Sequence, residues 1–229
     1  NEDTDLDLIF EKPFIYKYVD GFSPNLNKHL HIGHLSNLVL ANAFQKLNIG
    51  EKFIAILGDT LDGNVDKNEA LEKFKEYCKE FKYNIDDVFY ASEMKMKDES
   101  ILKDGEGNYV GSKIFDIGDE KIVGIKSSGL TSYFYQDVAL AQHLDSSTLY
   151  LTGFEQDNHF KALKKIFPNT NHIGLGLVKL NGKKMSSSEG NIIFLKDLFD
   201  QLLEIFNNDK KLVYNILAGQ ILKSTPSSD

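Results

Sequence analysis

The sequence predicts an α/β fold in which strands and helices alternate around a parallel sheet. Near the start, a strand-like run, a helical repeat and a second strand-like run follow one another, and the later stretches "TLYLTG", "DNHFKALKKIF" and "HIGLGLVKL" repeat that order. A helix between two strands is the usual connection of parallel neighbours. We therefore expect a doubly wound sheet made of two strand–helix–strand halves.

The first half of the sheet is expected to span residues 1–65. "FIYKYVDGFSPN" begins as a β-rich run at Phe14 and breaks at Gly21 into a loop that contains serine and proline. Apolar residues then recur at helical spacing until "NIG" ends the helix, and "KFIAILGD" has the pattern of a buried strand.

Residues 66–125 differ in character and are expected to form a short inserted module. A lysine-rich and acidic amphipathic helix, "KNEALEKFKEYCKEFKYN", is followed by short segments rich in glycine, aspartate and lysine. We expect parallel-sheet patterning to resume at "KIVGIK", with residues 126–195 forming the second half of the sheet. Two helical patterns, "LKDLFDQLLEIF" and "KKLVYNILAGQIL", predict a C-terminal helical segment over 196–229.

Composition narrows the setting of the protein. The chain has 229 residues, a net charge of −8 and no arginine. The acidic balance argues against a broad nucleic-acid-binding surface, so any such contact must be local. No apolar run approaches the roughly 20 residues that span a bilayer, and the start "NEDTDLDLIF" is acidic where a secretory signal would be basic. We expect a cytoplasmic monomer with no membrane contact, in which the single cysteine, Cys78, is a buried thiol.

Three histidines are concentrated in "NKHLHIGH", at the start of the first expected helix. In a doubly wound sheet, ligands bind beyond the carboxyl ends of the strands, where a helix N-terminus offers unpaired N–H groups to phosphate. His31 and His34 fall at that place, and Gly33 between them would let a nucleotide approach the backbone. The alternative is a His-x-x-His metal pair, but no cysteine or further histidine cluster supplies the remaining ligands.

A second motif, "KKMSSSEGNII", follows an expected strand near the end of the sheet. Taken alone, a lysine- and serine-containing segment of this kind is most simply interpreted as a solvated loop. Its side chains can also close over a triphosphate, and the presence of both motifs in this order favours a nucleotide site.

The two motifs resemble the HIGH and KMSKS signatures of class I aminoacyl-tRNA synthetases, and among these the arginyl-tRNA synthetases most. "SPNLNKHLHIGH" is similar to that family's S-P-N-x-x-K-P-x-H-x-G-H stretch, with His29 in place of the proline. "KSSGLTSYFYQDVALAQHL", "GFEQDNHFKALKKIF" and "LGLVKLNGKKMSSSEGNIIFLKDL" resemble further segments of the family in the same order. The resemblance covers most of residues 14–225. It implies a Rossmann-like (HUP-type) catalytic core without the family's N-terminal and anticodon-binding domains. The chain would then be either an excised core or a natural minimal paralog.

The resemblance also implies an amino-acid site that takes arginine. A guanidinium needs carboxylates in its pocket. Taken as isolated residues, Asp20 and Asp137 would be interpreted as a loop turn and a helix N-cap. Asp20 stands where the family usually has glutamate. The amino-acid-binding positions that the resemblance implies are Asp20, Asn25, Tyr133, Asp137 and Gln156.

An ATP site is implied beside it, with Mg²⁺ bridging the phosphates. Ser187 stands where KMSKS has its second lysine, and Lys28, just before HIGH, is the expected substitute. The catalytic residues would be Lys28, His31, His34 and Lys184. The ATP-binding residues would be His31, Gly33, His34, Lys184, Met185, Ser186, Ser187 and Ser188.

The implied activity is ATP-dependent activation of arginine to arginyl-adenylate and its transfer to tRNA(Arg). Two alternatives stay open on the sequence. One is a synthetase-like paralog that activates an amino acid for a different or non-tRNA acceptor. The other is a non-catalytic module that binds arginine or nucleotide.

Overall fold

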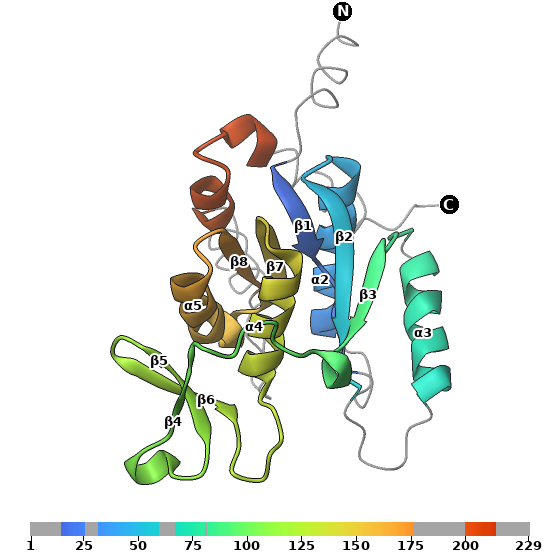
Figure 1. Ribbon diagram of the computed structural model, residues 1–229. Coiled ribbons are helices and arrows are strands. Elements are labelled where there is room, and N and C mark those ends of the chain that lie inside the picture. The colour runs from blue at the N-terminus through green and yellow to red at the C-terminus, as the bar shows by residue number, and fades with distance from the viewer. Residues whose placement is uncertain (1–14, 26–31, 60–66, 81, 176–199, 214–229) are drawn as a thin grey trace, which may run out of the picture.

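The computed structural model describes residues 15–25, 32–59, 67–80, 82–175 and 200–213 (Figure 1). Its main feature is a five-stranded sheet in the order β3-β2-β1-β7-β8, in which every neighbouring pair is parallel. This arrangement confirms the expected Rossmann-like α/β fold. The strands are β1 (Tyr16–Asp20), β2 (Gly50–Leu57), β3 (Asp87–Tyr90), β7 (Thr148–Gly153) and β8 (Thr170–Leu175).

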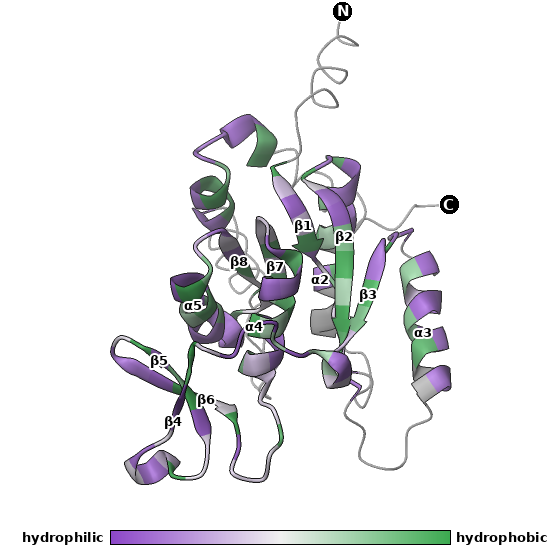
Figure 2. Ribbon diagram, in the orientation of Figure 1, coloured by the Kyte–Doolittle hydropathy of each residue, from purple (hydrophilic) through white to green (hydrophobic). Residues whose placement is uncertain are grey.

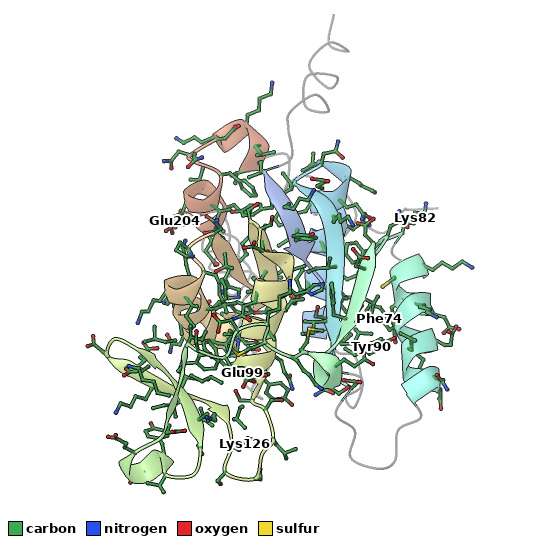
Figure 3. The ribbon with its side chains drawn as sticks, viewed as in Figure 1. Phe74, Lys82, Tyr90, Glu99, Lys126 and Glu204 are labelled. Carbon is green, nitrogen blue, oxygen red and sulfur yellow. The ribbon has the colours of Figure 1, made fainter. Side chains whose placement is uncertain are left out.

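One face of the sheet packs against α2 (Ile32–Lys46), α3 (Lys67–Glu80) and the helical residues of 200–213. Phe44 of α2 packs edge-on against Phe206, and Phe74 of α3 stacks on Phe22 and lies between its helix and Tyr90 of β3 (Figure 3). In Figure 2, hydrophobic residues occupy the carboxyl half of β2, whereas α3 alternates between hydrophobic and hydrophilic residues. The alternation is expected of a helix that buries one side only.

The opposite face of the sheet packs against α4 (Tyr133–Leu144) and α5 (Asp157–Ile166). Ser132 caps the start of α4, where its hydroxyl accepts a hydrogen bond of 3.1 Å from the backbone N–H of Tyr135. Asp145 ends the helix in a left-handed conformation with a φ of 45°. Tyr150 of β7 packs against Phe160 of α5, and both side chains belong to this second core.

A second, three-stranded antiparallel sheet is formed by β4 (Leu102–Asp104), β5 (Lys113–Ile117) and β6 (Glu120–Ile125). It lies beside α4 and α5, at the end of the molecule toward which the parallel strands point (Figure 1). The expectation that "KIVGIK" resumes the parallel sheet was wrong, because this stretch forms β6. A two-residue connection from β5, with Gly118 at a φ of 63°, makes an antiparallel partner the only geometry available.

The segment 66–125 is thus shared between the two sheets. Helix α3 and strand β3 belong to the large sheet layer, and only 102–125 contributes the antiparallel strands. Short single-turn helices join the parts: η1 (Ala91–Glu93), η2 (Gly107–Tyr109) and η3 (Phe154–Gln156). The division at 65/66, 125/126 and 195/196 stays a prediction.

Two sequence expectations concern single features of the fold. Cys78 is a buried free thiol, as expected, and burial raises its pKa to about 12. Within the described ranges, no helix is both long and apolar enough to cross a membrane.

The end of β1 lies unusually close to α2. A Cβ atom added to Gly21 would overlap the Cβ of Ala41 on that helix. Glycine at this position therefore lets the chain that leaves β1 pass directly under α2.

Candidate functional site

Two carboxylates from distant parts of the chain face the same space at the carboxyl edge of the large sheet. Asp20 is the last residue of β1, and its Cα partner on β7 is Tyr150. Partners in a parallel ladder direct their side chains to the same face of the sheet. Tyr150 belongs to the core formed with α4 and α5, so Asp20 is directed to that face, where α4 carries Asp137.

Asp20 is buried, with only 4% of its surface exposed. Its Oδ1 accepts a hydrogen bond from the Ser23 hydroxyl, and the same hydroxyl accepts a bond of 2.9 Å from the backbone N–H of Ile56 on β2. Ser23 is therefore oriented by β2 and in turn orients Asp20.

Burial raises the pKa of Asp20 to about 7, because desolvation disfavours the charged form. The hydrogen bond from Ser23 opposes this rise, and the nearby negative charge of Asp137 adds to it. The carboxyl group thus exchanges its proton near neutral pH. A cation bound beside it would favour the ionised form.

Asp137 is paired with a histidine from the neighbouring helix. Its Oδ2 lies 2.6 Å from Nε2 of His159 on α5, and the two side chains are 17% and 23% exposed. Phe134 and Phe160 each hold their ring centroid 5.1 Å from that of the imidazole, in edge-on orientation. The pair joins α4 to α5 at the edge of the site.

The hydroxyl of Tyr150 lies near both carboxylates. Burial raises the pKa of Tyr150 well above its usual range, and the charges of Asp137 and Asp20 raise it further. Among the described residues, this buried hydroxyl has no hydrogen-bond partner. A buried polar group without a partner costs about 1–3 kcal/mol, so such a group marks a place where a ligand or water completes the bonding.

Asn25 also lies at this edge, but the other two expected amino-acid-binding residues are more exposed. Asn25 forms a parallel bridge to Gly58 just beyond the end of β2. Tyr133 is the first residue of α4 and is 62% exposed, and Gln156 is exposed at the end of η3. The structure brings Asp20 and Asp137 together and leaves the side chains of Tyr133 and Gln156 on the surface. Ligand contacts for all five residues stay predictions.

The expected nucleotide residues fall only partly in the described chain. The backbone of Gly33 and His34 lies in the first turn of α2, which begins at Ile32. The start of this helix follows β1 in the chain, as the phosphate-binding helix of a doubly wound sheet does. The following residues lie outside the described ranges: Lys28, His31, Lys184, Met185, Ser186, Ser187 and Ser188.

The sequence did not reveal three residues that shape the site: Ser23, Tyr150 and His159. Ser23 stands in "SPN" and His159 in "DNHF", both within stretches that resemble the family. The Ser23–Asp20 contact joins residues three apart, whereas the contacts of Ser23 with Ile56 and of His159 with Asp137 depend on which strands and helices become neighbours. Spacing along the chain carries no signal of these long-range contacts.

Comparisons with known proteins found relatives of one name. A relative from Limosilactobacillus reuteri named arginine–tRNA ligase is 30% identical over 161 residues, which are 59% of this chain and 28% of that ligase. Ligases of the same name from Limosilactobacillus fermentum and Pediococcus pentosaceus are 32% and 28% identical, over 52% and 63% of this chain and 24% and 30% of their own length.

These matches confirm the resemblance to arginyl-tRNA synthetases, and they span less than a third of each of these three ligases. No family model matches the chain. Among solved structures, a pantothenate synthetase from Thermus thermophilus is similar with a TM-score of 0.37 and 14% identity, over 96% of this chain and 81% of that one.

Proposed function

We propose that this chain activates arginine with ATP to arginyl-adenylate and passes the arginyl group to tRNA(Arg). The observation that carries the proposal is that Asp20 is directed to the sheet face on which α4 carries Asp137, near enough for the charge of Asp137 to add to the rise that burial causes in the pKa of Asp20. It occurs in a chain whose curated relatives are named arginine–tRNA ligase.

The paired carboxylates are suited to a cationic amino acid. Hydrogen bonds between a guanidinium and carboxylates are charge-assisted and contribute about 1.5–3 kcal/mol each. The buried Tyr150 hydroxyl, whose pKa is raised by burial and by the charges of both carboxylates, adds a polar group that lacks a partner among the described residues. An uncharged side chain of the same size would offer no counter-charge to the two acidic groups.

The start of α2 would face the phosphates of ATP. We assign to this region the roles expected from the sequence: Lys28, His31 and His34 near the triphosphate, and Lys184 with Ser186–Ser188 in the segment that closes over it. Little covalent work falls to such a site, because positioning and charge neutralisation supply most of the rate.

Mg²⁺ would enter with ATP. Within the described residues there is no group of three acidic, histidine or cysteine side chains able to hold a metal ion. The oxygens of the triphosphate are the ligands that Mg²⁺ prefers. The ion would therefore be held mainly by the nucleotide, where it neutralises phosphate charge.

The reaction consists of two displacements. An oxygen of the arginine carboxylate forms a bond to the α-phosphorus of ATP, and the bond from this phosphorus to the bridging oxygen breaks, which releases pyrophosphate. A ribose hydroxyl of the tRNA then attacks the carbonyl carbon of the mixed anhydride. AMP leaves and the hydroxyl proton is released.

Pyrophosphate exchange tests the proposal. The 229-residue chain is assayed with arginine, with lysine and with citrulline, each with and without tRNA(Arg). Citrulline matches arginine in shape but has no charge, so we expect exchange with arginine and none above background with citrulline. Exchange that prefers another amino acid would contradict the proposal. Thermal stabilisation by arginine or ATP without turnover would support the non-catalytic alternative.

A variant tests the expected lysine. Because Lys28 would substitute for the missing lysine of the second motif, Lys28→Ala should reduce the exchange rate by about 100-fold or more. Lys46→Ala is the matched control, since Lys46 is exposed at the opposite end of α2. Equal rates for Lys28→Ala and the unaltered chain would remove this lysine from the mechanism.

A further inference from the structure

We propose that His159 is a positioning residue that fixes the Asp137 carboxylate for a cationic ligand. The inference rests on the proposed function, which it deepens by adding a residue that does not itself touch the substrate. Its basis is the juxtaposition of α4 and α5 at the edge of the site.

The contact between the two side chains is short and well supported. Nε2 of His159 lies 2.6 Å from Oδ2 of Asp137, within the range of a charge-assisted hydrogen bond. Among the described residues, this is the one hydrogen bond of the Asp137 side chain, so Oδ1 is left for another donor.

The imidazole is held in place from two sides. Phe134, on the same helix as Asp137, packs at an interplanar angle of 80° to the ring, and Phe160 packs at 63°. Phe134 in turn packs edge-on against Phe115 of β5, with ring centroids 5.1 Å apart. These contacts limit rotation of the ring, so Nε2 has a fixed direction.

A fixed donor has two consequences for Asp137. It selects one rotamer of a side chain that would otherwise sample several, which removes part of the entropy cost of binding. It also occupies one carboxylate oxygen and leaves the other to accept a hydrogen bond from the ligand. Both effects strengthen the binding of a cationic amino acid and leave ATP untouched.

Three substitutions separate positioning from packing. His159→Leu removes the donor, His159→Gln places an amide N–H near the position of Nε2, and His159→Asn places one near the position of Nδ1. Since the bond uses Nε2, glutamine should restore what leucine and asparagine lose. A merely structural role would not distinguish the two amides in this order.

The experiment measures KM for arginine and KM for ATP by pyrophosphate exchange, and the melting temperature of each variant. We expect His159→Leu and His159→Asn to raise KM for arginine by about 10- to 100-fold, with KM for ATP changed by less than about 2-fold. His159→Gln should return KM for arginine to within about 3-fold of the unaltered chain. Equal KM values for all three variants would overturn the proposal.

His172→Gln is the matched control. His172 is also a half-buried histidine stacked on Phe160, but it contacts Thr152 and Asp157 and does not contact Asp137. We expect KM for arginine to stay unchanged in this variant even if the melting temperature falls.

A measurement without substrate keeps the inference separate from the proposed function. Nitrogen NMR of the histidine rings should show His159 protonated at Nε2, and Asp137→Asn should shift that signal. If the unaltered chain shows no exchange with arginine but this coupling is present, the proposed function fails and the positioning contact stands. If Asp137→Asn leaves the His159 signal unchanged, the contact is absent and the inference fails.

Discussion

Asp20 is the residue at which stability and ligand binding oppose each other. The side chain is buried at the end of a central strand, where an ionised carboxylate is disfavoured by desolvation. Ser23 offsets part of that cost with its hydrogen bond. A cation bound beside Asp20 would favour the ionised form, whereas burial in the empty protein favours the neutral form.

The pH dependence of stability tests this interpretation. The pKa of Asp20 is raised to about 7 in the folded chain from an ordinary value of 3.8, so folding binds a proton between these values. The stability of the unaltered chain should fall as pH rises through this window, by up to about 4 kcal/mol. Asp20→Asn removes this loss, so its advantage in melting temperature over the unaltered chain should be larger at pH 8 than at pH 5.

Asp116→Asn is a control in which the pKa shift of the carboxyl group has the opposite sign. The hydrogen bond and charge of Lys103 hold the pKa of Asp116 below its usual value, so this group stabilises the fold at neutral pH and the effect is lost in acid. Asp116→Asn should therefore show no advantage at pH 8. An Asp20→Asn difference that does not change with pH would contradict the burial argument.

At the scale of single residues, the sequence predicted which residues lie at the site better than it predicted which side chains they contact. The ends of strands are where a doubly wound sheet places ligands, but Asp20 was assigned to the amino-acid site by the family resemblance. Asp137 came from the same resemblance. Neither rule reaches His159, because the Asp137–His159 contact exists only once α4 and α5 lie side by side.

At the scale of elements, the contact between Gly21 and α2 determines how closely the helix approaches the sheet. The end of β1 carries Asp20, and α2 begins just after "NKHLH", so this approach also sets the distance between the carboxylate and the helix start. Any side chain at position 21 would separate the two elements.

Gly21→Ala should lower stability by about 1–3 kcal/mol, measured by denaturant unfolding, because its methyl group overlaps that of Ala41. The double variant Gly21→Ala with Ala41→Gly removes the overlapping atom. Although Ala41→Gly alone costs about 1 kcal/mol in a helix, the double variant should be less destabilised than the sum of the two. Strict additivity would show that the two positions do not touch.

Whether a segment forms a strand or a helix was predictable where its apolar pattern was clear. The second-half strand "TLYLTG" coincides with β7, and "DNHFKALKKIF" contains α5. Strand β3, four residues long, and strand β6 were missed or misassigned because a short apolar run does not say which sheet it joins. The hairpin turn at Gly118 was the available signal for β6, since so short a connection requires an antiparallel pair.

At the scale of the whole molecule, the small sheet is part of the second core. Phe115 of β5 is 1% exposed and packs against Phe134 of α4, in the same cluster as Tyr150 and Phe160. The inserted strands therefore support the helix that carries Asp137.

Phe115→Ala should lower the melting temperature of the entire chain in one transition, with a loss of about 3–5 kcal/mol in the free energy of unfolding. The measurement is thermal unfolding followed by circular dichroism and by the near-ultraviolet absorbance of the tyrosines, since the chain has no tryptophan. Val110→Ala is the control, because Val110 is 72% exposed and its loss should change stability by less than about 0.5 kcal/mol. A separate early transition in Phe115→Ala would show that the small sheet unfolds independently.

The strand order also affects how the polypeptide folds while it is synthesised on the ribosome. Strand β1 lies between β2, which emerges soon after it, and β7, which is synthesised only after the whole of 66–147. Until β7 emerges, the nascent chain exposes an unpaired edge of β1, and unpaired strand edges invite aggregation. We expect this protein to depend on chaperones during translation more than a helical bundle of equal length would, because its central pairing is among the last to close.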